Sequence, residues 1–178
     1  PLMEEGCEIL LTSPLQSAPY VEMTLSVMAR FGVTAEKTPQ GFRVPPGQRY
    51  QSPGPVTAEG DWSGAAFFLC AGALGGPVTV SGLAPCSSQG DKAVADILQD
   101  MGAILSWEKD ALTVSRGTLR AVTVDSAPIP DLIPVLALTA ACCQGESRFT
   151  NAGRLRLKES DRLSAICRMI EGLGGTAF

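Results

Sequence analysis

A cluster of basic residues between positions 148 and 168 has the clearest chemical potential in this sequence. It holds six of the fourteen Lys and Arg residues, in a chain whose formal net charge is −4. Because these side chains bind carboxylates and phosphates, the cluster predicts a local anion site, at the start of a predicted helix whose free N–H groups also attract anions. The alternative is a solvated helix start with Lys158 and Arg162 four residues apart. The cluster consists of Arg148, Arg154, Arg156, Lys158, Arg162 and Arg168.

Carboxylates are the best candidates for proton transfer, because the chain contains no histidine. Asp131 precedes a strongly apolar segment, Leu132 to Cys143. A carboxylate at the head of a buried helix is partly desolvated, which raises its pKa and makes it a suitable base. The alternative role is a simple helix N-cap, which is equally open to Asp61 at the head of a second apolar segment.

Two hydroxyl groups occur near the amino terminus, in the segment Ser17-Ala18-Pro19-Tyr20. They stand at a predicted helix start before an apolar stripe, so N-capping by Ser17 and packing of the Tyr20 ring are the plain alternatives to ligand binding. The six cysteines form no CxxC pair and lie mostly in apolar runs, which favours burial as reduced side chains over disulfide bonds.

The composition limits the classes of protein to which the chain can belong. Its 178 residues are 45% hydrophobic, which is enough for one substantial core or two small ones and excludes intrinsic disorder. The acidic balance, with a pI near 4.8, excludes a protein that coats nucleic acid. No apolar run reaches the roughly 20 residues that a membrane span needs. A reducing, cytoplasmic location fits these features and the cysteines best.

An internal repeat of about 70 residues organises the chain. Three segments share an apolar pair, two spacers, an apolar residue and a glycine, and they end at Gly32, Gly102 and Gly174. The apolar segments after Asp61 and Asp131 show the same offset. The first series predicts amphipathic helices with glycine C-caps, and the second predicts helices that are buried on most sides. Short β-type runs between them complete a βαβαββ unit; they are 77–81, 103–107, 112–116, 121–124 and 147–150.

The repeat count and a proline-rich linker predict two domains, each with repeat units that lie outside this chain. About two and a half units fit into the chain, and Gln51-Ser52-Pro53-Gly54-Pro55 is the strongest linker, with a crossover near Glu59 to Asp61. The chain begins with Pro1 and stops at Phe178 in what resembles the start of a strand. We therefore expect a piece of a longer protein, with apolar faces that favour self-association.

The run Lys158-Glu159-Ser160-Asp161-Arg162 resembles the KE(S/T)DR signature of the 5-enolpyruvylshikimate-3-phosphate synthase family. Three further stretches match that family in the right order, so the resemblance covers nearly the whole chain. They are Ser17 to Tyr20, Gln51 to Gly54 followed by Glu59-Gly60-Asp61, and Ile129-Pro130-Asp131.

The resemblance implies the α/β enolpyruvyl transferase fold, an inside-out α/β barrel of βαβαββ repeats. Residues 1–59 would be the last repeat of the domain on the shikimate 3-phosphate side. Residues 60–178 would be a partial second domain that carries the catalytic Asp and the KESDR motif. The implied reaction transfers the enolpyruvyl group of phosphoenolpyruvate to the 5-hydroxyl of shikimate 3-phosphate, with no metal or organic cofactor and no nucleic-acid or membrane partner.

The resemblance also assigns roles to individual residues. Asp131 would bind and deprotonate the 5-hydroxyl, Glu159 would serve the methylene carbon, and Lys158 would contact the hydroxyl and the bridging region. Arg162 would hold phosphoenolpyruvate, since its planar fork matches a carboxylate. The substrate-binding set implied by the resemblance is Ser17, Tyr20, Asp131, Arg154, Lys158 and Arg162.

Arg154 departs from the family pattern, because some members have an asparagine at this position. Two other functions stay open at this point. One is the related transfer of enolpyruvyl to a UDP-amino sugar, although that enzyme lacks the KE(S/T)DR run. The other is a non-catalytic piece that only folds and associates, since the parent can be an enzyme while residues 1–178 alone are inactive.

Overall fold

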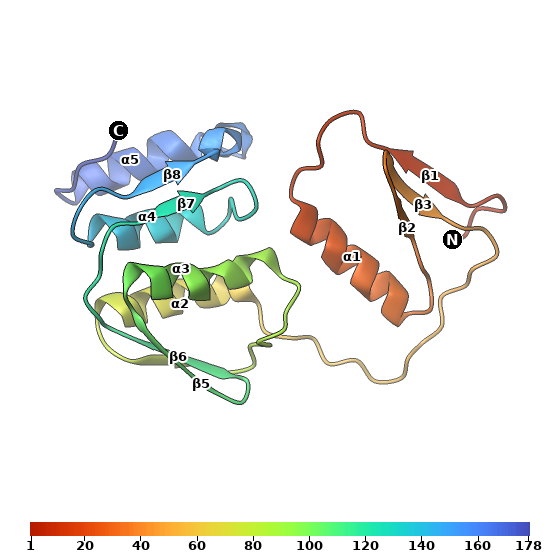
Figure 1. Ribbon diagram of the computed structural model, residues 1–178, viewed down its shortest axis with the longest axis horizontal. Helices are drawn as coiled ribbons and strands as arrows, with labels where there is room; N and C mark the ends of the chain where they lie inside the picture. Colours follow the sequence, from red (N-terminus) through yellow and green to blue (C-terminus); the bar gives the residue numbers. More distant parts are fainter. The chain divides into compact units, whose positions relative to one another are not determined.

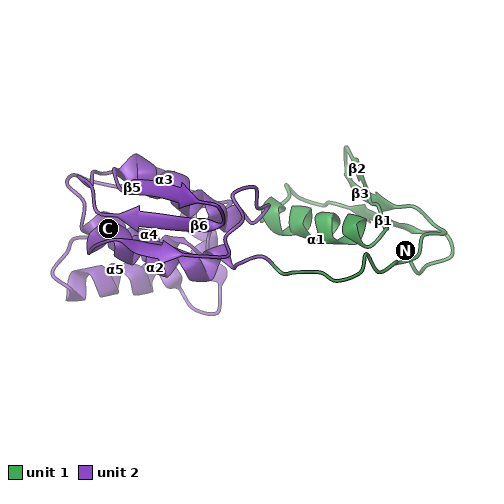
Figure 2. Cartoon of the chain, turned by 90° about the horizontal axis from the view of Figure 1, so that it is seen from below, with its two compact units in different colours: residues 1–58 green, residues 59–178 purple.

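The computed structural model describes all residues from Pro1 to Phe178. They form two compact units, Pro1–Ala58 and Glu59–Phe178 (Figure 2). The second unit begins directly after the Pro- and Gly-containing stretch 51–58, which has no helix or strand.

Unit 1 consists of one helix and a three-stranded antiparallel sheet in the order β1-β3-β2 (Figure 1). The helix α1 has no buried residue, and the buried apolar side chains of this unit are Val33, Phe42 and Val44. Unit 1 thus has only a small core. The elements are β1 (Cys7–Leu10), α1 (Ala18–Arg30), β2 (Glu36–Thr38) and β3 (Gly41–Val44).

Unit 2 combines four α-helices with two sheets, so the chain is a mixed α/β protein. One sheet is antiparallel, in the order β4-β6-β5, and the other is the parallel pair β7-β8. The elements are α2 (Trp62–Leu74), β4 (Val78–Val80), η1 (Gly90–Lys92), α3 (Ala93–Met101), β5 (Ile104–Glu108), β6 (Ala111–Ser115), β7 (Thr123–Asp125), α4 (Ile133–Ala141), β8 (Arg148–Thr150), η2 (Ala152–Leu157) and α5 (Arg162–Gly172).

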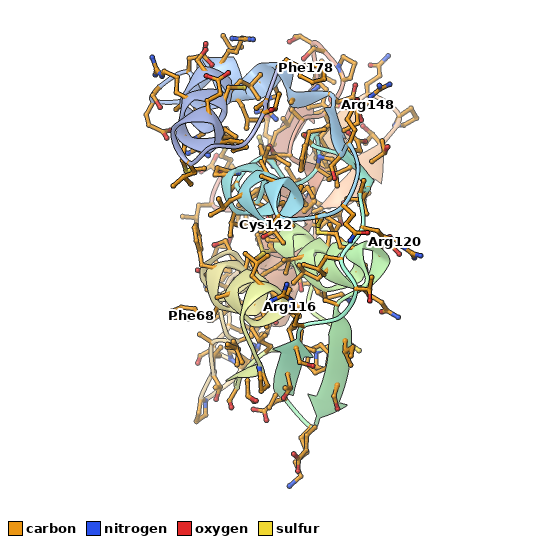
Figure 3. The ribbon with its side chains drawn as sticks, turned by 90° about the vertical axis from the view of Figure 1, so that its left-hand side faces the viewer. Phe68, Arg116, Arg120, Cys142, Arg148 and Phe178 are labelled. Carbon is orange, nitrogen blue, oxygen red and sulfur yellow. The ribbon has the colours of Figure 1, made fainter.

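The helix α2 lies at the centre of the packing in unit 2. It contacts α3 and α4 and also the strands β4 and β6, while α4 in turn contacts α5 (Figure 1). As predicted, α2 and α4 bury most of their residues, but Phe67 and Phe68 are 57% and 63% exposed (Figure 3). This agrees with the prediction of helices that are buried on most sides, and Phe67 and Phe68 mark the remaining, exposed side of α2.

The 70-residue repeat is confirmed in the elements of unit 2. Strand β4 begins at Val78 and β8 begins at Arg148, 70 residues later, and each follows an apolar helix and precedes an amphipathic one. In α3, Val94, Leu98 and Met101 are fully buried, as the spacing predicts. Gly102 caps α3 in the left-handed conformation, with φ 100°.

Two predictions about side-chain environments need correction. The N-cap role that was open to Asp131 is not realised, because α4 begins at Ile133, its N-cap residue is Leu132 and no side chain forms a cap hydrogen bond there. All six cysteines are free, but only Cys70 is fully buried, while Cys86 and Cys142 are exposed, because both lie at or beyond the end of a helix or strand.

None of the helices combines the length and the hydrophobicity that a membrane span requires.

Candidate active site

The carboxylate of Asp131 is held by two cations from the KESDR run. Its Oδ1 atom accepts a hydrogen bond from a terminal nitrogen (Nη1) of Arg162 at 2.7 Å and lies 3.4 Å from Nζ of Lys158. The three side chains are between 23% and 31% exposed, so they are shielded without being cut off from solvent. This arrangement brings together residues that are 27 and 31 positions apart in the sequence.

Glu159 extends this cluster on the solvent side. Its Oε1 accepts hydrogen bonds from Nε of Arg162 at 2.9 Å and is 2.8 Å from Nη2, and the side chain is 68% exposed. A hydrogen bond from the backbone N–H of Glu159 and the bond from Arg162 lower the pKa of this carboxyl. One guanidinium therefore holds two carboxylates through different N–H groups, a geometry that a lysine cannot provide.

The start of α5 positions the KESDR residues. Asp161 is the N-cap of this helix: its carboxylate accepts hydrogen bonds from the backbone N–H of Ser164 at 3.1 Å and from its hydroxyl at 2.8 Å. Arg156 donates a further bond of 2.8 Å to Asp161. With this cap formed, Arg162 becomes the first helical residue and its side chain is anchored by a rigid helix.

Lys158 is not a helical neighbour of Arg162. It follows the 3₁₀ helix η2 in an extended conformation, with φ −78° and ψ −168°. The alternative interpretation, two solvated charges four residues apart on one helix, is therefore wrong. Instead, both side chains converge on Asp131 from two different local structures.

Three further residues were predicted to bind substrate, namely Ser17, Tyr20 and Arg154. Arg154 is part of η2 and is half-buried. Ser17 and Tyr20 belong to unit 1: Ser17 precedes α1 in the left-handed conformation without a side-chain cap bond, and Tyr20 is 44% exposed. The structure thus unites Asp131, Lys158, Glu159 and Arg162 within unit 2.

Two carboxylates near the amino terminus of α2 add to this part of unit 2. Asp61 caps α2, as one alternative predicted, by accepting bonds from Ser63 and Gly64, and the hydroxyl of Ser63 is the main reason why its pKa is lowered. Asp91 of η1, which the sequence analysis did not identify, is only 7% exposed. No local pattern in the sequence marks this residue, because its burial depends on the packing of η1 against α2.

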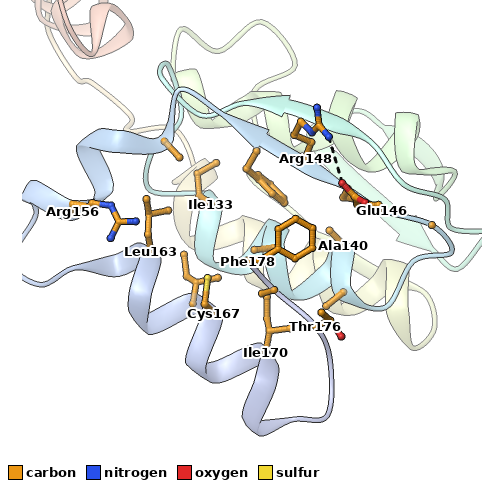
Figure 4. Close-up of a pocket in the computed structure, with 18 residues that line it drawn as sticks. Ile133, Ala140, Glu146, Arg148, Arg156, Leu163, Cys167, Ile170, Thr176 and Phe178 are labelled. Carbon is orange, nitrogen blue, oxygen red and sulfur yellow. Dashed lines mark hydrogen bonds and ion pairs between the residues drawn. The ribbon is translucent and has the colours of Figure 1, made fainter.

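An apolar cavity of about 560 Å³ lies elsewhere in unit 2 (Figure 4). It is lined by residues of α4, β8 and α5 and by the carboxy-terminal residues, among them Ile133, Ile170 and Phe178. Its walls contain neither Asp131 nor Lys158, and their charged side chains are Glu146, Arg148 and Arg156. Nor does the chain contain three or more His, Cys, Asp or Glu side chains arranged to hold a metal ion.

The cluster around Asp131 contains the groups that proton exchange with an anionic substrate requires. Asp131 and Glu159 can each exchange a proton with a substrate, and Lys158 and Arg162 can neutralise negative charge on a carboxylate or phosphate. Both acid–base groups are carboxylates, which agrees with a chain that lacks histidine.

Curated relatives match almost the whole chain. A protein named 3-phosphoshikimate 1-carboxyvinyltransferase from Halobacterium salinarum is 43% identical over 97% of this chain and 42% of its own length. Proteins of the same name from Methanocorpusculum labreanum and Clostridium perfringens are 41% and 39% identical, over 98% of this chain and 41% of theirs. The chain thus spans about two fifths of the length of these relatives.

Solved structures agree with this likeness at the level of the fold. An EPSP synthase from Acinetobacter baumannii superimposes with a TM-score of 0.76 at 23% identity, over 94% of this chain and 39% of that one. The enolpyruvyl transferase NikO from Streptomyces tendae gives a TM-score of 0.54 at 22% identity, over 76% of this chain and 33% of that one. The predicted enolpyruvyl transferase fold is confirmed.

The sequence model of one family extends over both units. It is described as EPSP synthase (3-phosphoshikimate 1-carboxyvinyltransferase), and it matches residues 1–177. Together with the KESDR cluster around Asp131 and the relatives at about 40% identity, this match shows that the chain belongs to the EPSP synthase family.

Proposed function

We propose that this chain is part of an enzyme that transfers the enolpyruvyl group of phosphoenolpyruvate to the 5-hydroxyl of shikimate 3-phosphate. The observation that carries the proposal is the contact of Asp131 with both Lys158 and Arg162, together with Glu159 on the same guanidinium. Two carboxylates beside two cations support this proposal, because a reaction between two anionic substrates needs proton exchange and neutralisation of negative charge.

In the first half of the reaction, the methylene carbon of phosphoenolpyruvate takes up a proton and its neighbouring carbon becomes cationic. The 5-hydroxyl oxygen attacks this carbon and loses its proton. In the second half, the methyl group gives a proton back, the carbon–oxygen bond to phosphate breaks, and the enol double bond reforms. Phosphate leaves with the proton lost by the hydroxyl, so no oxidant or reductant is consumed.

We assign Asp131 as the base for the 5-hydroxyl and Glu159 as the group that exchanges a proton with the methylene carbon. Lys158 would contact the hydroxyl and the bridging oxygen, and Arg162 would hold the carboxylate of phosphoenolpyruvate. The contacts of Arg162 with Asp131 and Glu159 support this role, because the same N–H groups suit an incoming carboxylate.

The remaining assignments concern the units. We propose that residues 60–178 supply the catalytic Asp and the KESDR motif, and that residues 1–59 belong to the domain on the shikimate 3-phosphate side. Ser17, Tyr20 and Arg154 would then bind shikimate 3-phosphate. The six free cysteines support a reducing compartment such as the cytoplasm.

The test is turnover by the complete protein that contains this chain. Purified protein is incubated with phosphoenolpyruvate and shikimate 3-phosphate, and released phosphate and enolpyruvyl product are measured. A UDP-amino sugar replaces shikimate 3-phosphate in a parallel assay. We expect product only with the shikimate substrate; product only with the sugar would transfer the assignment to the related enzyme, and product with neither would remove it.

A further inference from the structure

Two loops of unit 2 carry Asp131 and Lys158, and both loops start at the ends of paired strands. Strand β7 ends at Asp125 and the chain continues to Asp131, while β8 ends at Thr150 and the chain continues through η2 to Lys158. The two strands are parallel, with Asp125 opposite Thr150, so both loops leave the same edge of this sheet (Figure 1). The relative position of Asp131 and Lys158 therefore depends on how the loops are held together where they start.

The carboxylate of Asp125 binds both loops. Its Oδ1 atom accepts a hydrogen bond from the backbone N–H of Ala127 at 3.1 Å, in its own loop, and one from Nδ2 of Asn151 at 3.0 Å, at the start of the other loop. The backbone N–H of Ser126 also donates to the carbonyl of Thr150 at 2.9 Å. The two loops are thus joined directly after the strands end.

The backbone of Asn151 determines the direction of the second loop. It has the left-handed conformation, with φ 54° and ψ 27°, which Asn and Asp adopt more readily than other residues with a side chain. The turn leads directly into η2, and Lys158 follows the last residue of η2. Asn151 therefore directs its own loop through its backbone and holds the opposite loop through its side chain.

Each loop also has a buried apolar side chain, Ile129 in the first and Leu155 in the second. Apolar burial holds the loops on the core of unit 2, but it is not directional. The hydrogen bonds of Asp125 and Asn151 are directional, so they fix how the two loops are oriented relative to each other.

We propose that Asp125 and Asn151 are a positioning pair that sets the separation of Asp131 and Lys158. The inference rests on the proposed function, in which these two side chains act on the same hydroxyl group. Contacts of Lys158 and Arg162 with Asp131 join the loops at the site, and the pair joins them at the strand ends. A misplacement of about 1 Å can cost about 10² in rate, so a contact away from the substrates can control turnover.

The hydrogen bonds of the pair are formed at neutral pH. The bond from Asn151 is the main reason why the pKa of Asp125 is lowered, and the backbone N–H of Ala127 lowers it further. Because folding lowers this pKa, the stability from these bonds is present above the ordinary pKa of an aspartate and is lost as the pH falls through the lowered value. Assays near pH 7 therefore report on the intact pair.

The test exchanges the two side chains of the pair. Asn151→Asp replaces the donor by a second carboxylate that repels Asp125, and adding Asp125→Asn restores one donor and one acceptor. Both substitutions keep the side-chain shape, and Asp also tolerates the left-handed backbone. Asp96→Asn makes the same kind of change at an exposed position of α3 and is the control.

In the complete protein, we expect kcat of Asn151→Asp to fall about tenfold or more, with KM for phosphoenolpyruvate changed by less than about threefold. This KM is spared because Arg162 belongs to α5, which Asp161 caps. The double variant should recover kcat to within about threefold of wild type. A kcat of Asn151→Asp within about twofold of the Asp96→Asn control, or a loss that the double variant does not relieve, would overturn the proposal.

Amide hydrogen exchange needs no turnover and keeps this inference separate from the proposed function. In Asn151→Asp, the backbone N–H groups of Ala127 and Leu132, in the opposite loop, should exchange about threefold faster or more, and the double variant should reverse this change. Faster exchange confined to the two loops supports the pair even if the protein forms no product, in which case only the proposed reaction fails. Unchanged exchange at both amides, or an equal increase throughout α2 and α4, would overturn the inference whatever the activity.

Discussion

At the scale of residues, one guanidinium organises the candidate active site. Arg162 contacts Asp131 through Nη1 and Glu159 through Nε and Nη2, and Lys158 approaches the same oxygen of Asp131. Arg162 forms ion pairs with both carboxylates, so the removal of either one leaves the guanidinium paired with the other. We therefore expect the proposed chemistry to depend on both carboxylates and on the planar shape of Arg162.

Removal of either acid–base group should reduce turnover strongly. We expect Asp131→Asn and Glu159→Gln to lower kcat in the complete protein by about 10² to 10⁴, the usual effect of losing a positioned acid or base. Steady-state assays with both substrates measure this loss, with Asp96→Asn as the control. Turnover within about tenfold of wild type in either variant would show that its carboxyl does not have the assigned role.

Arg162→Lys keeps the charge and removes the planar fork. Because a lysine cannot hold a carboxylate through two parallel N–H groups, we expect KM for phosphoenolpyruvate to rise about tenfold and KM for shikimate 3-phosphate to change much less. Arg168→Lys, at an exposed position of α5, is the matched control. An equal loss for both substrates would place Arg162 outside the phosphoenolpyruvate site.

At the scale of elements, helix termini place the site residues. Asp161 caps α5 and thereby sets the direction of Arg162, and Asp61 caps α2 at the end to which Gln89 is bonded. The two capped helices are connected through α4, which packs against both α2 and α5. Substitutions that alter this packing should therefore also shift the side chains of the candidate active site.

The helix α2 packs closely against the β4-β6-β5 sheet at Gly72. A Cβ atom there would lie 2.5 Å from the carbonyl oxygen of Val114 and 3.1 Å from Cβ of Val78. We expect Gly72→Ala to lower the free energy of unfolding by about 1–3 kcal/mol, because the helix must move off the sheet. Chemical denaturation of the purified chain measures the difference.

Gly172→Ala is the control for this substitution. Gly172 lies in the last turn of α5 with open space around its Cα, so alanine should stabilise the helix by up to about 1 kcal/mol. If both variants changed stability in the same direction, helix propensity rather than the contact with the sheet would explain the effect at Gly72.

At the scale of the whole molecule, large apolar side chains remain exposed in both units. Unit 1 exposes Ile9, Leu10 and Val27, and unit 2 exposes Phe67 and Phe68. Unit 1 has a helix without buried residues over a small sheet, so most of its apolar surface faces solvent. Exposed apolar side chains favour association, since their burial contributes about 25 cal/mol per Å².

We expect residues 1–178, expressed alone, to self-associate and to form no enolpyruvyl product. Sedimentation velocity over a concentration series should show species larger than the monomer. Val27→Ser should reduce the association, and Gln99→Ser, at an exposed polar position of α3, should leave it unchanged. A strictly monomeric chain would contradict the association, and turnover near that of a complete enzyme would contradict the expected inactivity.

Local patterns in the sequence were sufficient for the repeat, the helices and the motif. The 70-residue period, the glycine ends of the helices and the KESDR run depend on neighbours a few positions apart, and such patterns reflect the period of the helix or strand. They predicted the fold that the comparisons confirm. The roles of the individual site residues stay predictions, because they came from the resemblance.

Only the tertiary structure decided which charges meet. Asp131 contacts Arg162 across 31 positions, and the bond from Gln89 to Gly60 spans 29, so neither contact has a local sequence signal. The burial of Asp91 likewise depends on how η1 packs against α2, which no spacing within the run Gln89-Gly90-Asp91 reveals. Burial and long-range electrostatics arise from the folded packing of distant segments, and for that reason the sequence predicted the motif but the structure revealed its surroundings.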